Sequence, residues 1–160
     1  DPFLIDFRWK TFKDMLVSLI FENEFEGGEL NYDTDRSRFQ INNGKTKHST
    51  NLRNLDIVNS TIKGNVRHSL LMNCKVEQGM IYHSDLYSTE TEETKLFNCF
   101  VDEESVVKDS YIAGGKTVFA GTMIGGIFRE GKDFGETSEF KGDIEFIEIE
   151  FTTNKRMNIV

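Results

Sequence analysis

Small residues recur through the middle of the chain in matching apolar and polar surroundings. An apolar residue stands three positions before each small residue and another two positions after it, while a polar or turn-forming residue comes immediately before. The six stretches are IVNSTI, LMNCKV, IYHSDL, LFNCFV, VKDSYI and FAGTMI, centred on Ser60, Cys74, Ser84, Cys99, Ser110 and Thr122. Internal repetition of this kind is typical of stacked solenoids rather than of one globular core.

The spacing of the repeats predicts the length of a coil. Taking every second repeat, Ser60 to Ser84 spans 24 residues, Ser84 to Ser110 spans 26, and Cys74 to Cys99 spans 25. This alternation indicates a coil of about 25 residues with two equivalent strands. We therefore expect an all-β fold, a parallel β-solenoid of about three coils. A meander whose strands are alike by chance is the alternative.

The direction of each side chain follows from the alternation within a strand. Positions two before, at and two after the small residue share one face, so Ser84 and Cys99 should point inward and their predecessors His83 and Asn98 outward. On a coil with two strands, Cys74 and Cys99 lie one coil apart, with about 4.8 Å between their Cα atoms. Parallel neighbours suit a disulfide poorly. We predict two buried free thiols and no need for an oxidising compartment.

The N-terminal segment has a different period from the repeats. Residues 8–21 place Trp9, Phe12 and Leu16 at helical spacing, which predicts an amphipathic helix. Residues 1–30 would then form a cap over the exposed first coil of the solenoid, or present the apolar stripe of the helix to a partner.

The remaining boundaries follow from the end of the repeats. We expect an irregular segment with a strand over 31–54, the solenoid over 55–135, and a C-terminal strand and tail over 136–160. Apolar residues alternate with glutamates near 143–151, which predicts a strand that closes the open end or offers an edge to another chain. The candidate interface residues are the apolar positions of the two end segments: Trp9, Phe12, Leu16, Ile147, Ile149 and Phe151.

Composition narrows the choice of partner. The chain has 160 residues with 19 Lys and Arg against 27 Asp and Glu, which gives a formal net charge of -8. A chain this acidic and without a basic stripe is not expected to bind nucleic acid or an anionic membrane. No apolar run is long enough to span a membrane and no signal peptide is apparent. We expect the protein in a virion or in the cytoplasm.

The NSxI and NCxV units resemble the coils of parallel β-helix proteins, the pectate-lyase-like class found in polysaccharide-active enzymes and in bacteriophage tail and baseplate proteins. The resemblance covers roughly residues 55–128 and concerns the pattern of the fold. It implies either a structural role in a large assembly or an action on polysaccharide.

Candidate binding residues are the polar side chains that a coil with two strands would gather on one outer face. Asn59, His83 and Asp109 would form an outward column there, and Asp85 lies close to it in sequence. Paired carboxylates carry out acid–base chemistry in polysaccharide-cleaving enzymes. We therefore take His83, Asp85 and Asp109 as candidate carbohydrate-binding residues and assign no catalytic residue. A solvated polar ladder is the alternative.

Motifs for metals and cofactors do not appear in the chain. The three histidines lack the spacing of zinc ligands, and the paired glycines do not stand in a phosphate-binding context. We expect neither a metal nor a cofactor.

Two hypotheses of function follow. The first is a non-enzymatic structural module, a component of a bacteriophage virion or a similar large assembly, with copies of itself or other subunits as partners. The alternative is a carbohydrate-binding or polysaccharide-cleaving β-helix protein, and enzymatic activity stays open.

Overall fold

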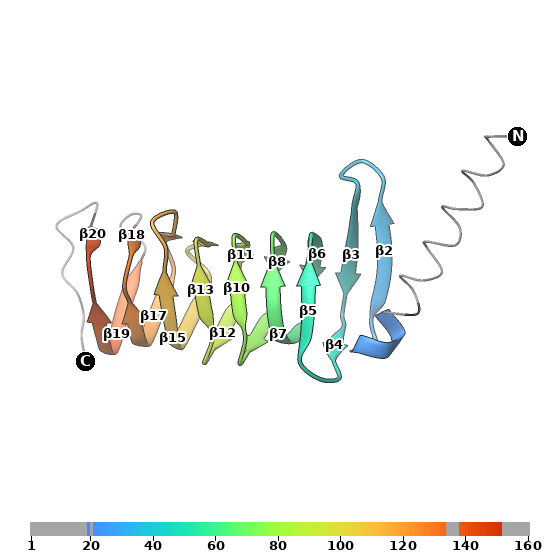
Figure 1. Ribbon diagram of the computed structural model, residues 1–160, viewed down its shortest axis with the longest axis horizontal. Coiled ribbons are helices and arrows are strands. Elements are labelled where there is room, and N and C mark those ends of the chain that lie inside the picture. The colour runs from blue at the N-terminus through green and yellow to red at the C-terminus, as the bar shows by residue number, and fades with distance from the viewer. Residues whose placement is uncertain (1–18, 20, 134–137, 152–160) are drawn as a thin grey trace, which may run out of the picture.

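A computed structural model describes residue 19 and residues 21–133 and 138–151 of the chain. These residues form twenty β-strands and one short helical segment. The strands stack along one long axis, from β2 (Glu29–Asp33) at the N-terminal end to β20 (Ile149–Phe151) at the other (Figure 1). The arrangement is a solenoid of about seven turns, which confirms the predicted all-β solenoid.

A turn of the solenoid holds three short strands rather than two. Asp85 pairs in parallel with Leu70 of the turn before and with Phe100 of the turn after, so these turns are 15 residues long. The predicted coil with two strands is wrong, and so is the number of three coils. The sequence pattern did not reveal the repeat of three strands per turn, because two of the central corners, Thr89 and Thr94, lie within an acidic run and each lack one of the two apolar flanks of the repeat.

The three sides of each turn are called faces 1, 2 and 3 in chain order. Faces 1 and 2 form one sheet of eleven strands, and face 3 belongs to a second sheet of nine. Four long strands contribute to both face 1 and face 2: β7 (Thr61–Arg67), β15 (Val106–Ala113), β17 (Thr122–Phe128) and β19 (Glu139–Phe146).

Shorter strands complete the faces. Face 1 also contains β4 (Lys45–Thr46), β9 (Lys75–Glu77) and β12 (Glu90–Glu92), and face 2 contains β5 (Thr50–Arg53), β10 (Met80–Tyr82) and β13 (Lys95–Phe97). Face 3 contains β3 (Arg38–Asn42), β6 (Leu55–Val58), β8 (Leu70–Met72), β11 (Asp85–Tyr87), β14 (Phe100–Val101), β16 (Val118–Phe119), β18 (Gly131–Asp133) and β20. These strands pair in parallel.

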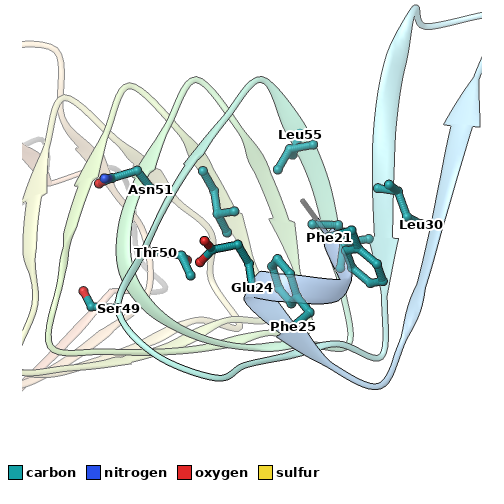
Figure 2. Close-up of a pocket in the computed structure, with 10 residues that line it drawn as sticks. Phe21, Glu24, Phe25, Leu30, Ser49, Thr50, Asn51 and Leu55 are labelled. Carbon is teal, nitrogen blue, oxygen red and sulfur yellow. The ribbon is translucent and has the colours of Figure 1, made fainter. Parts of the chain in front are cut away.

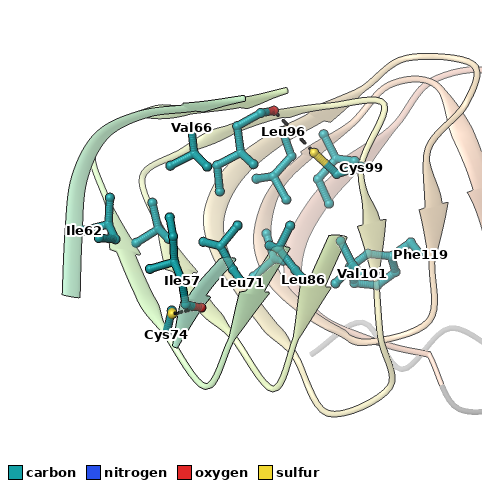
Figure 3. Packing of buried hydrophobic residues seen from close by; sticks show 14 of the residues in the cluster. Ile57, Ile62, Val66, Leu71, Cys74, Leu86, Leu96, Cys99, Val101 and Phe119 are labelled. Atoms are coloured by element: carbon teal, nitrogen blue, oxygen red, sulfur yellow. Dashed lines mark hydrogen bonds between the residues drawn. The ribbon is translucent and has the colours of Figure 1, made fainter. Parts of the chain in front are cut away.

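Inward side chains of equivalent strands stack in rows that form the core. Figure 3 shows the face-3 row, whose members are Ile57, Leu71, Leu86, Val101 and Phe119. The face-2 row is Leu52, Val66, Ile81, Leu96, Ile112 and Phe128. The face-1 row is Ile62, Val76, Thr91, Val107, Met123 and Phe140. Burial of each large apolar side chain stabilises the fold by about 1.5–3 kcal/mol.

Each corner of a central turn has the same two-residue construction. An outward residue takes a left-handed conformation, as at His83 (φ 47), and an inward small residue follows, here Ser84. The Ser84 hydroxyl accepts a hydrogen bond from the Ser69 backbone N–H of the preceding turn (3.1 Å) and donates one to the Tyr82 carbonyl (2.8 Å). The predicted directions, small residue inward and predecessor outward, are confirmed for this pair and for Asn98 and Cys99, where Asn98 is likewise left-handed and Cys99 is buried.

The two cysteines occupy different corners. Cys74 follows the corner between faces 3 and 1, and Cys99 follows the corner between faces 2 and 3, so the two thiols do not stack one turn apart as predicted (Figure 3). Both are buried and free, as expected. Each sulfur donates to a backbone carbonyl of the preceding turn, Cys74 to Ile57 (3.1 Å) and Cys99 to Ile81 (3.3 Å).

The N-terminal end is covered by antiparallel strands. β2 pairs with β3 on face 3, and β1 (Phe25–Glu26) pairs with β4 on face 1. The predicted helix over 8–21, with Trp9, Phe12 and Leu16, lies almost wholly outside the described residues. The described part is a short helical segment that ends at residue 24, too short to serve as the predicted helical cap.

A buried ion pair fastens the N-terminal cap, which comprises β1, β2 and the turn from β2 to β3, to the solenoid. The carboxylate of Asp56 in β6 is almost fully buried, and its Oδ2 lies 2.7 Å from Arg36 Nη1 while its Oδ1 lies 3.4 Å from Arg38 Nε. Strands β3, β4 and β5 already pair in parallel with later strands. The ladder of the solenoid therefore begins within residues 31–54, upstream of residue 55.

The C-terminal segment turns a corner where one strand was predicted. β19 ends at Phe146, Glu148 takes a left-handed conformation (φ 54), and β20 then runs on face 3. Ile147 lies half-buried at the bend, whereas Ile149 packs against the core. Ile147, Ile149 and Phe151 alternate with glutamates in the sequence as they would in one straight strand, so the alternation alone did not reveal the corner at Glu148.

Substituting the two residues of one corner should separate their roles. Ser84→Asp places a charge in the buried ladder, so we expect the free energy of unfolding to fall by about 3 kcal/mol or more. His83→Asp, one residue earlier, should have a mild effect because the side chain is exposed and Asp tolerates left-handed backbone. Urea unfolding of both variants measures this, and equal losses would contradict the corner geometry.

A substitution at Thr91 should raise the stability of the fold instead of lowering it. Its side chain is 0% exposed and its hydroxyl has no hydrogen-bond partner, while the neighbours in the face-1 row are Val76 and Val107. Thr91→Val replaces an unpaired buried hydroxyl with a methyl group, so we expect a gain of about 1 kcal/mol in the free energy of unfolding. A loss of stability in thermal or urea unfolding would show that the hydroxyl is satisfied in solution.

Candidate functional site

The candidate column of Asn59, His83 and Asp109 does not exist in the structure. These residues stand at three different corners: Asn59 between faces 3 and 1, Asp109 between faces 1 and 2, and His83 between faces 2 and 3. Asp85 lies exposed on face 3, between Leu70 and Phe100 in the ladder. The prediction failed because it distributed the repeats over two strands per turn instead of three.

The corner residues form ladders with their own equivalents. The side-chain amide of Asn73 donates to Asn59 Oδ1 (2.6 Å), and the rings of His68 and His83 stack with centroids 5.3 Å apart and an angle of 5°. At these corners the side chains therefore interact with the equivalent side chains of neighbouring turns.

The outer surface of face 2 carries an aromatic ladder. The rings of Tyr82 and Phe97 stack with their centroids 5.1 Å apart and an interplanar angle of 14°. The ring centroids of Phe97 and Tyr111 are 6.0 Å apart. Arg67 covers the free face of Tyr82 at 4.8 Å, and Arg129 donates to the Tyr111 hydroxyl (3.4 Å), which raises the pKa of the guanidinium. Because Arg67 and Phe97 lie against the ring of Tyr82, this tyrosine does not present an open face on which a sugar ring would stack.

A polar groove runs along the corner between faces 3 and 1. It encloses about 450 Å³, and its polar lining includes Asn59, Asn73, Lys75, Ser88, Glu90 and Glu104. The Ser88 hydroxyl donates to Glu104 Oε2 (2.6 Å). The hydrogen bond from Lys75 to Glu77 (3.2 Å) raises the pKa of the lysine. Sequence reasoning missed this groove, and the signal that would have found it is the five-residue spacing of the corners.

The N-terminal end contains an apolar cavity of about 290 Å³ (Figure 2). Phe21, Phe25, Leu30 and Leu52 contribute apolar walls, and Thr50 contributes a hydroxyl that is buried without a hydrogen-bond partner. Thr50 belongs to β5, the first strand of face 2. β5 pairs with β7, and no described strand lies on its other edge.

The C-terminal end is a complete last turn. Among the described residues, β19 pairs with β17 and β20 pairs with β18, and no further strand follows them. Ile144, Phe146 and Ile149 of this turn are only partly buried against the core. Of the candidate interface residues, Ile147 and Ile149 lie here, Phe151 occupies β20, and Trp9, Phe12 and Leu16 fall outside the described residues.

Within the described part of the chain, no group of three or more His, Cys, Asp or Glu side chains has the arrangement to hold a metal ion. That same part contains no helix of the length and apolar character needed to cross a membrane. Comparison with protein-family models and with curated proteins gives no match for this chain. The fold is therefore assigned from the ladder itself, and function rests on the geometry described above.

Burial controls the chemistry of the two thiols. It raises the pKa of Cys99 from 9.0 to about 11 and raises the pKa of Cys74 in the same direction. A thiol is nucleophilic as its thiolate, so neither cysteine has the character of an activated nucleophile.

The raised pKa of Cys99 predicts a dependence of stability on pH. Between its ordinary value of 9.0 and about 11, the unfolded chain loses the proton while the folded chain keeps it. The free energy of unfolding should therefore fall as pH rises through this window. Cys99→Ser is the control, because Ser69 and Ser84 fill equivalent corners. Urea unfolding at pH 8 and at pH 10.5 should show a larger loss for the wild type than for the variant.

Proposed function

We propose that the protein is a non-enzymatic structural module that assembles through protein–protein contacts at the ends of its solenoid. The observation that carries this proposal is the contrast between its sides and its ends. Along the sides, backbone groups pair between turns and many polar side chains pair with their equivalents. At the ends, the described residues leave one edge of β5, β19 and β20 without a neighbouring strand.

Stiffness suits the module to this role. Each turn is joined to the next by parallel pairing on three faces and by three rows of buried side chains. Continuous pairing on three faces and a continuous core resist bending between turns, so the two ends keep a fixed separation.

The separation of the candidate carboxylates argues against a polysaccharide-cleaving site built from His83, Asp85 and Asp109. Acid–base cleavage requires two carboxyl groups on either side of one bond. Asp85 lies on an outer face and Asp109 at a corner between the two other faces.

The setting that we propose is a bacteriophage virion or a similar large assembly. Its support is the resemblance of the repeat to the β-helices of tail and baseplate proteins, together with the strand edges that the described residues leave unpaired at the two ends. Protein subunits, either copies of this chain or others, are the proposed partners.

Molar mass in solution tests the proposal. Size-exclusion chromatography with light scattering across a concentration series should show mass rising with concentration, because an unpaired strand edge is a template for association. A monomer at every concentration would remove self-assembly from the proposal.

The polar groove supports a second candidate function, carbohydrate binding. Amide, amine, hydroxyl and carboxylate groups line one concave corner there, and such groups hydrogen-bond sugar hydroxyls. Calorimetry with oligosaccharides should then show binding that Glu104→Gln weakens. Glu103→Gln is the matched control, because Glu103 is exposed and does not line the groove. Identical titrations for the two variants and the wild type would exclude the groove as a sugar site.

A further inference from the structure

The buried hydroxyls at the corners accept hydrogen bonds in one consistent direction. The Thr94 backbone N–H donates to Ser110 Oγ of the following turn (3.2 Å), the Ser69 N–H donates to Ser84 Oγ (3.1 Å), and the Gly44 N–H donates to Ser60 Oγ (3.0 Å). In each pair the donor belongs to the turn nearer the N-terminal end. At these three corners the hydroxyl therefore accepts from the turn that precedes it, whereas the Thr46 hydroxyl on face 1 accepts from the Lys63 N–H of the following turn (2.9 Å).

Thr50 is a corner hydroxyl for which the described residues supply no preceding turn. It aligns with Gly64 in the ladder, and successive turns continue this column through Gly79 and Thr94 to Ser110. The side chain of Thr50 is only 5% exposed, and Oγ1 has no hydrogen-bond partner. Among the described residues no strand lies before β5, and a strand added there would offer an N–H to this oxygen as the preceding turn does at the other corners.

On face 2 the described part of the cap has no strand, and Phe21 and Glu24 of the short helical segment line the cavity there instead. β2 covers the first parallel strand of face 3, and β1 covers that of face 1. Over face 2 the described residues place no equivalent strand, and the apolar cavity opens beside Thr50 (Figure 2). Leu52 also lines this cavity. As far as the described residues show, the N-terminal end therefore has one of its three faces open to a further strand.

The C-terminal turn has the geometry to fill that position. Gly126 continues the column from Ser110 and pairs with Ile144, and Phe128 pairs with Phe146 in the face-2 row. Adding β19 of one copy before β5 of another preserves strand direction and register. It brings an Ile144 N–H to Thr50 Oγ1 and the Phe146 side chain over Leu52, at the cavity.

Charge on the two ends is complementary on face 2. At the N-terminal end Arg53 lies exposed beside Arg67, a neighbour of like charge. At the C-terminal end the exposed outward residues of the same face and the next corner are acidic: Asp143, Glu145 and Glu148. In the extended ladder Glu145 aligns with the position of Asn51, two residues from Arg53 on the same side of the strand, within reach of a long side chain.

We propose that the occupant of the open N-terminal position is the C-terminal turn of a second copy of this chain, so that copies associate head to tail through β19 and β5. This inference rests on the proposed function and specifies its partner and its interface. Because the two surfaces differ, the contact does not close on itself, and further copies can add.

Charge reversal at the two ends tests the contact. Arg53→Glu places like charges at the interface from one side, and Glu145→Arg does so from the other. Each variant alone should lose self-association in light scattering at low salt. An equimolar mixture should recover it, because every end then meets an end of opposite charge. Wild-type association retained by both variants would overturn the head-to-tail contact while leaving self-assembly intact. A monomeric wild type would overturn both.

The Thr50 hydroxyl provides a test independent of charge. Thr50→Val should leave the folded monomer at least as stable, because the hydroxyl has no partner there, and it should weaken association about tenfold by removing an acceptor from the interface. Thr91→Val is the matched control: its hydroxyl is also unpaired but lies inside the solenoid, so association should not change. Equal association constants for the two variants would show that no N–H of a second copy reaches Thr50.

Discussion

The hydrogen bond from a backbone N–H to an inward hydroxyl of the next turn is the interaction on which the corners of this solenoid depend. A chain that turns sharply every few residues would otherwise bury unpaired N–H groups at each bend, and such groups destabilise a fold. A side chain such as Ser84 solves this locally, since it accepts from the turn before and donates to a carbonyl two residues earlier. The left-handed residue in front of it supplies the change of direction.

The close stacking of successive turns also decides which small residue stands at each inward corner position. In the column of Thr50, Gly79 stands so close to the neighbouring turn that a Cβ would collide with the carbonyl oxygen of Gly64. Elsewhere in this column Thr94 and Ser110 fill the space, and their hydroxyls lie 3.2 Å apart. Glycine, serine and threonine therefore alternate according to how closely successive backbones approach.

The repeat unit and the class of fold were visible in the sequence, but the number of strands per turn was not. The prediction found corners where the apolar flanks are strong, as at Cys74 and Cys99, and correctly turned their small residues inward. It passed over Thr89 and Thr94 because acidic neighbours hide them. That omission changed a turn of three strands into a coil of two, and it placed His83 and Asp109 in one column. The apolar cavity and the polar groove follow from the true turn, so neither could be derived from the mistaken one.

The composition of the core changes along the axis of the solenoid. Apart from Thr91 the central rows are aliphatic, whereas Phe119, Phe128 and Phe140 contact one another near the C-terminal end, with ring centroids 5.6 to 6.2 Å apart. Aromatic contacts of this kind stabilise beyond their buried area.

Because the central turns are equal in length, the effect of inserting residues into the chain can be predicted. Asp85 stands 15 residues from each of its partners, Leu70 and Phe100. Insertion of one whole turn would lengthen the rod by a single strand spacing, about 4.8 Å, and return every later residue to its own face. Insertion of a third of a turn would preserve the corners yet move all later side chains round to the adjacent face. Evolution can thus adjust the length of this rod and the orientation of its surface in separate steps, without redesigning the core.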